Sequence, residues 1–86
     1  MKLTASEIKV LAFLKHDRRG SMPSLSGIGM GLYPDKITNA QGFALMVCRP
    51  VKSLLKKRLI ENYPTEGQGR YSIAYAGERA LQDIGV

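Results

Sequence analysis

The chain has 86 residues, a length that suits one domain with a single modest core. Hydrophobic residues make up 44% of it and charged residues 23%, which is the usage of folded soluble proteins and excludes a disordered or fibrous chain. Thirteen Lys and Arg against seven Asp and Glu give a net charge of +6, and this excess favours polyanionic partners such as nucleic acid or an anionic membrane surface.

Cysteine, histidine and long apolar runs are scarce. The single cysteine, Cys48, cannot form a disulfide within the chain, and no Cys or His cluster has the spacing of metal ligands. No apolar run approaches the roughly 18 residues that a membrane span needs, and the first residues lack the apolar stretch of a secretion signal. We therefore expect a cytoplasmic protein with no membrane segment, no metal and no cofactor.

A first helix is predicted near the N-terminus. Thr4 and Glu7 fit a capping box, in which the side chain of each residue accepts a hydrogen bond from the backbone amide of the other. Apolar residues at helical spacing follow until a polar run at 17–20. The helix is therefore expected over about residues 5–17.

A second, shorter helix is predicted to begin around Pro23, because the first turn of a helix tolerates proline. Leu25, Ile28 and Leu32 would face inward, and the helix would end before the turn that starts at Tyr33. Three glycines fall within it, and each costs roughly 1 kcal/mol in a helix interior. Helix propensity therefore works against this segment.

The longest predicted helix covers about residues 39–57. Thr38 and Gln41 repeat the capping-box pattern at its start. Pro50 lies within it and removes one backbone hydrogen bond, so we expect a kink near 46–50 or a helix that restarts at Pro50. Its apolar residues share one helical face, and they are Ala44, Val47, Cys48, Val51, Leu54 and Leu55.

A β-hairpin and a short closing helix are predicted for the rest of the chain. Residues 59–63 and 70–75 alternate as strands do, and a Gly- and Pro-containing loop at 64–69 separates them. Tyr71, Ile73 and Tyr75 would share one face of the second strand. The closing helix would span 77–84, with Leu81 and Ile84 on its inner side.

This order of elements resembles the winged helix-turn-helix domains of bacterial and phage regulators, such as the MarR-like group. The resemblance covers nearly the whole chain, and the segments that carry it are 47–61, 71–73 and 77–81. Two positions depart from the pattern: Arg58 stands where a turn glycine is common, and Ala44 where the reading helix commonly has Ser or Thr. The resemblance implies a single α+β winged helix-turn-helix domain over residues 1–86, with double-stranded DNA as its partner and no cofactor.

Several polar residues are candidates for DNA contact. Arg49, Lys52, Ser53 and Lys56 lie three or four residues apart on the polar side of the third helix, where Arg49 would read a base edge in the major groove. A solvated helix face explains the same pattern without DNA. Gln41 could bind an adenine edge or cap its helix instead. The resemblance adds Gln68 and Arg70 near the tip of the hairpin, the wing at 64–70.

The predicted function is sequence-specific binding of double-stranded DNA by a bacterial or phage transcriptional regulator. One alternative is a protein-interaction module with an apolar patch at Phe43, Leu45 and Met46, and another is a phage packaging, excision or replication factor. No paired acid and base, activated nucleophile or small-molecule site is evident, so we do not expect an enzyme. A homodimer would have to form through the chain ends, roughly 1–14 and 77–86.

Overall fold

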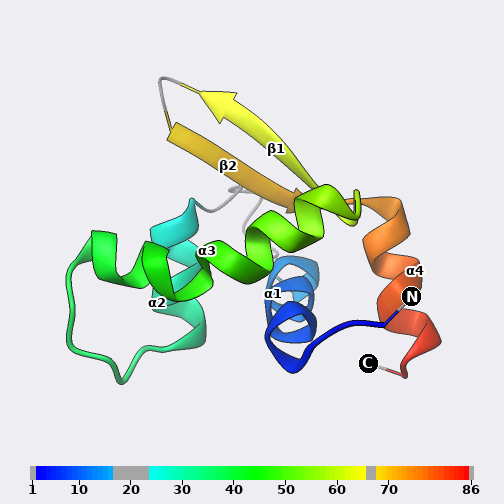
Figure 1. The fold of residues 1–86 in the computed structure, drawn as a ribbon, viewed down its shortest axis with the longest axis horizontal. Coiled ribbons are helices and arrows are strands. Elements are labelled where there is room, and N and C mark those ends of the chain that lie inside the picture. The colour runs from blue at the N-terminus through cyan, green and yellow to red at the C-terminus, as the bar shows by residue number, and fades with distance from the viewer. Residues whose placement is uncertain (1, 17–23, 66–67, 86) are drawn as a thin grey trace.

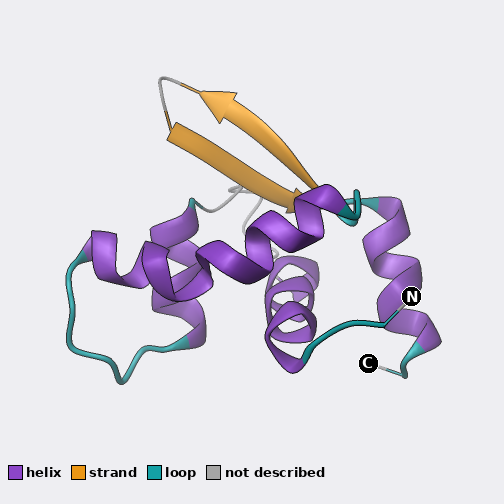
Figure 2. Ribbon diagram, in the orientation of Figure 1, coloured by secondary structure: helices purple, strands orange, loops and turns teal. Residues whose placement is uncertain are grey.

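A computed structural model describes residues 2–16, 24–65 and 68–85, apart from the side chains of 63–65, 68 and 69. Across this described part, four helices accompany one two-stranded antiparallel sheet, so the fold is α+β as predicted (Figure 2). The elements in chain order are α1 (Ala5–His16), α2 (Leu25–Leu32), α3 (Ala40–Lys56), β1 (Ile60–Thr65), β2 (Gln68–Ile73) and α4 (Tyr75–Asp83).

The predicted capping box begins α1. The Thr4 amide donates to Glu7 Oε1 at 2.9 Å, and the Glu7 amide donates to Thr4 Oγ1 at 3.2 Å. The helix runs to His16, which is exposed, while its predicted polar end at 17–20 lies outside the described residues. Its buried face is mostly apolar, with Leu11 fully buried, and also carries Glu7.

Close packing against α3 explains one of the three glycines of α2, Gly29. Ser24 caps the helix by accepting from the Gly27 amide at 3.3 Å, whereas Pro23 lies outside the described residues. Ile28 is fully buried, as predicted. A Cβ on Gly29 would collide with the backbone carbonyl of Phe43, so only glycine lets the two helix backbones approach this closely. Packing between α2 and α3 thus compensates for low helix propensity.

The cap of α3 differs from the predicted one. Asn39 is the N-cap residue and its Oδ1 accepts from the Gly42 amide at 2.8 Å. The predicted capping box of Thr38 and Gln41 is therefore wrong, because the helix begins at Ala40 and Asn39 already supplies the acceptor. The Gln41 side chain is exposed.

Pro50 lies inside α3, and the helix continues through it from Ala40 to Lys56. The alternative of a restart at Pro50 is therefore wrong. A proline lacks one backbone donor, and the flanking turns of the helix keep the rest of the ladder. Phe43 is 8% exposed and joins the predicted apolar face, on which Val47, Val51 and Leu54 are also buried.

A tight turn ends α3 at Arg58. The Leu59 amide donates to the Leu54 carbonyl and the Arg58 amide to the Leu55 carbonyl, both at 3.0 Å, which is the hydrogen-bond pattern of a Schellman motif. Arg58 has a φ of 61°, the left-handed conformation that usually selects glycine. The turn thus keeps its geometry without glycine, at a cost of about 1 kcal/mol.

The hairpin strands extend further towards the tip than predicted, to Thr65 in β1 and from Gln68 in β2. Residues 64, 65, 68 and 69 of the expected loop therefore belong to the strands, and residues 66 and 67 lie outside the described part. In the antiparallel register Ile60 lies opposite Ile73, and Asn62 opposite Tyr71. Ile60 and Tyr71 are buried, so this face of the hairpin belongs to the core.

The chain leaves the sheet earlier than predicted and begins α4 at Tyr75. The Ala74 amide donates to the Leu59 carbonyl at 3.0 Å and closes the base of the hairpin. The predicted strand position of Tyr75 is therefore wrong, and its side chain is 73% exposed. Leu81 is fully buried as expected, but Ile84 is 43% exposed because α4 ends at Asp83.

One core joins the elements. It contains residues from every helix and both strands, and its buried members are Val10, Leu11, Leu14, Ile28, Val47, Val51, Leu54, Leu59, Ile60, Tyr71 and Leu81. In Figure 1, α3 crosses the middle of the molecule between α2 at one end and α4 at the other, and the hairpin runs back above α3. None of the helices in the described part is long and apolar enough to cross a membrane.

Candidate nucleic-acid interface

One face of α3 is open to solvent. Its exposed residues are three or four positions apart, so they form a single line along the helix, here called the exposed stripe: Gln41, Leu45, Arg49, Lys52 and Lys56. The buried residues Phe43, Val47, Val51 and Leu54 lie on the other side of the helix. The predicted candidates Gln41, Arg49, Lys52 and Lys56 are therefore brought together, whereas Ser53 is not part of this line.

The exposed stripe is positive. Arg49, Lys52 and Lys56 fill its C-terminal half, and the sequence contains no Asp or Glu between Asp35 and Glu61. Within the described part of the chain, none of the three cations forms a salt bridge. Cations gathered on one helix face, within a stretch of sequence that has no carboxylate, produce a local positive potential that attracts polyanions.

Ser53 and Lys57 instead bind a buried carboxylate. Glu7 is 3% exposed, and its Oε2 accepts from Ser53 Oγ at 2.9 Å and from Lys57 Nζ at 2.8 Å. The Thr4 amide binds the other carboxylate oxygen. This cluster joins the start of α1 to the end of α3, and it engages the hydroxyl of Ser53, one of the residues predicted to contact DNA.

The cluster also sets the charge state of Glu7. Burial opposes ionisation, but the hydrogen bonds from Lys57, Thr4 and Ser53 outweigh it and lower the pKa of Glu7 from 4.5 to about 2. Glu7 is therefore ionised at neutral pH. The sequence predicted only its capping role, because no local spacing links Glu7 to Lys57, which lies 50 positions further along the chain.

The two hairpin candidates lie on the second strand. Strand alternation places the Arg70 side chain on the face of β2 opposite to that of Tyr71, which faces the core. The Gln68 side chain lies outside the described part. Arg70 is half-buried and already interacts within the protein. The hairpin therefore supplies a less accessible cation than α3 does.

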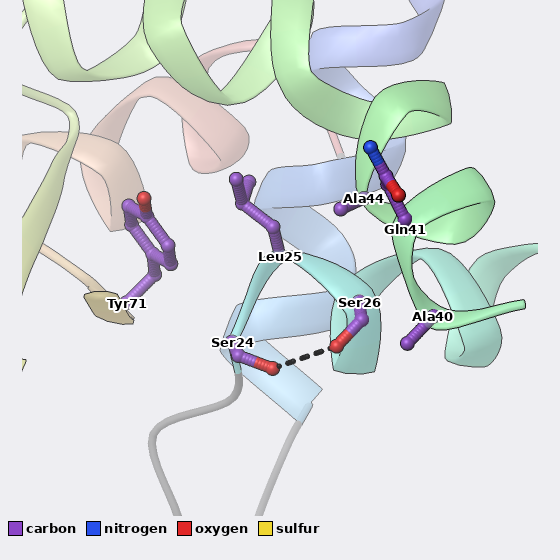
Figure 3. Close-up of a pocket in the computed structure, with 7 residues that line it drawn as sticks. All are labelled: Ser24, Leu25, Ser26, Ala40, Gln41, Ala44 and Tyr71. Carbon is purple, nitrogen blue, oxygen red and sulfur yellow. Dashed lines mark hydrogen bonds between the residues drawn. The ribbon is translucent and has the colours of Figure 1, made fainter. Parts of the chain in front are cut away.

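A small pocket of about 280 Å³ lies between the starts of α2 and α3 and the strand β2 (Figure 3). Its described lining carries no charged side chain and consists of Ser24, Leu25, Ser26, Ala40, Gln41, Ala44 and Tyr71. The pocket falls just below the roughly 300–1,000 Å³ of typical ligand sites. Burial, and then the neighbouring Cys48, raise the pKa of Tyr71, so its hydroxyl stays neutral at physiological pH.

Neither metal ligands among the described residues nor similarity to known proteins suggests another function. No group of three or more His, Cys, Asp or Glu that could hold a metal ion exists among the described residues. Comparison of the chain with protein-family models, curated proteins and solved structures found no match. The exposed stripe is thus the feature from which a function can be argued.

Proposed function

We propose that this chain is a winged helix-turn-helix protein that binds specific sequences of double-stranded DNA, as a bacterial or phage transcriptional regulator. The observation that carries the proposal is the exposed stripe, where Arg49, Lys52 and Lys56 share one face of α3 with no carboxylate between Asp35 and Glu61. The order of three helices, a hairpin and a closing helix supports it. The fold order alone would not be enough, since one fold serves many functions.

In this proposal α3 lies in the major groove, which is wide enough to admit a helix. Arg49 donates to the O6 and N7 acceptors of a guanine and thereby selects a base. Lys52 and Lys56 neutralise phosphates, which strengthens binding to any sequence. The hairpin is the wing and lies against the adjacent backbone or minor groove.

The test begins with selection of bound sequences from a random duplex pool at a stated salt concentration. With the enriched duplex, we expect Arg49→Ala to weaken binding by about 1–3 kcal/mol and to relax one base preference. Lys56→Ala should weaken all sequences alike and lower the slope of log K against log salt by about 0.9. Arg79→Ala on α4 is the control and should change neither. Failure of the wild type to enrich any duplex would contradict the proposal.

The alternative function, a protein-interaction module, depends on an exposed apolar patch that is only partly present. Of the apolar patch predicted at Phe43, Leu45 and Met46, Phe43 is buried, Met46 is half-buried and only Leu45 is open, at 69% exposed. Leu45 lies on the exposed stripe between Gln41 and Arg49, and these polar neighbours suit a polyanion better than an apolar protein surface. A packaging, excision or replication factor would use the same stripe on DNA, and a homodimer through the chain ends stays a prediction.

A further inference from the structure

Leu45 is out of place for a solvated helix face. It is 69% exposed and is the one large hydrophobic side chain that the described part of α3 leaves open. One turn before it on the exposed stripe lies Gln41, and one turn after it lies Arg49. Removing the Leu45 side chain from water would lower the free energy, and at this position only a binding partner can cover it.

We propose that Leu45 contacts the C5 methyl group of a thymine in the major groove and thereby selects an A·T pair. This inference rests on the proposed binding of DNA. The thymine methyl is the apolar group that base edges present in that groove, and the N-terminal part of a recognition helix is the part that reaches base edges. Leu45 is the sixth residue of α3, within that part.

The neighbours of Leu45 fix where the thymine lies. Four helical residues advance about 6 Å, and successive base pairs are about 3.4 Å apart, so Leu45 reads about two base pairs from the guanine of Arg49. On the other side, Asn39 supplies the helix cap, which frees the Gln41 amide to bind an adenine edge. The expected site therefore has A·T pairs towards Gln41 and a G·C pair towards Arg49.

A base rather than a protein side chain is the occupant that the surroundings favour. The stripe on either side of Leu45 is an amide and a guanidinium, which match base acceptors and would be left unpaired against an apolar protein groove. The absence of carboxylates over residues 36–60 removes repulsion of the phosphates that flank any base.

The experiment replaces single thymines by uracils in the duplex enriched from the random pool. Uracil keeps Watson–Crick pairing and lacks only the C5 methyl. We expect wild-type affinity to fall about fourfold at one position, the factor for one buried methyl group, and to change little at the others. Leu45→Ala should bind the thymine and uracil duplexes equally. Ile84→Ala removes an exposed aliphatic residue from the end of α4 and should respond to uracil as the wild type does.

Two results would overturn the inference in different ways. Equal losses in wild type and Leu45→Ala, or none in either, would show that Leu45 touches no methyl group, while sequence-specific binding itself would stand. If the wild type enriches no duplex, the proposed function fails and the inference falls with it. Because Leu45 is exposed, the variant should keep the wild-type melting temperature, and equal melting curves separate lost contact from lost folding.

Discussion

The buried Glu7 cluster makes a quantitative prediction about acid stability. The pKa of the Glu7 carboxyl falls from 4.5 in the unfolded chain to about 2 in the folded protein. This difference corresponds to about 3 kcal/mol of stability. Because the folded pKa is the lower one, the unfolded state takes up the proton first as the pH falls. The contribution is complete above about pH 4.5 and is lost as the pH falls towards 2.

Glu7→Gln tests this value, because glutamine keeps the shape and one acceptor oxygen but removes the charge. The free energy of unfolding of both proteins is measured by urea denaturation, followed by circular dichroism, at several pH values between 6 and 2. The free energy of unfolding of the wild type should exceed that of the variant by about 3 kcal/mol at pH 6, and this gap should close towards pH 2. The other carboxylates titrate in both proteins, so their effects cancel in the difference.

A gap that stays constant between pH 5 and pH 2 would refute the charge pairing of Glu7 with Lys57. A gap that closes above pH 4.5 would show that burial raises the pKa of Glu7 instead of being outweighed. Glu78→Gln is the matched control, because Glu78 is exposed in the first turn of α4. The difference in free energy of unfolding between this control and the wild type at pH 6 should be much smaller than that for Glu7→Gln.

Three further substitutions test the packing around α3. Gly77→Ala should lower the melting temperature and the stability by at least about 2 kcal/mol, because a Cβ there would strike the Leu59 carbonyl oxygen; an unchanged melt would refute this close approach. Arg58→Gly should raise stability by up to about 1 kcal/mol in urea denaturation, since glycine adopts a φ of 61° without strain. Ser53→Ala should lower stability by about 1–2 kcal/mol through loss of the bond to Glu7, yet leave the DNA affinity of the folded protein unchanged, and a weakened affinity would return Ser53 to the interface.

Periodicity was enough to predict the four helices and most of their inner faces, and a capping pattern correctly marked the start of α1 but not that of α3. The spacing of Val47, Val51 and Leu54 identified the buried side of α3, and Thr4 with Glu7 marked the start of α1. Such features depend on residues within a few positions of one another. The same spacing predicted that Arg49 and Lys56 would share an exposed face.

Contacts between distant segments could not be predicted in this way. Glu7 meets Lys57 only because α1 packs across the end of α3, and Gly29 matters only because the Phe43 carbonyl lies against it. The strand pattern of residues 70–75 predicted too long a strand, because the chain leaves the sheet after the bond from the Ala74 amide to the Leu59 carbonyl and begins α4 at Tyr75. Each of these outcomes is decided by tertiary packing rather than local preference.

The most direct test of the proposed function removes the positive charge of the exposed stripe. Arg49, Lys52 and Lys56 are changed together to alanine, and affinity for the enriched duplex is measured by fluorescence anisotropy at fixed salt. The control removes three exposed cations of the same kinds elsewhere on the protein, and these are Lys2, Lys9 and Arg79. The account predicts that the stripe variant loses specific binding while the control, with the same net charge, retains most of it. Equal binding by the stripe variant and the wild type would contradict it.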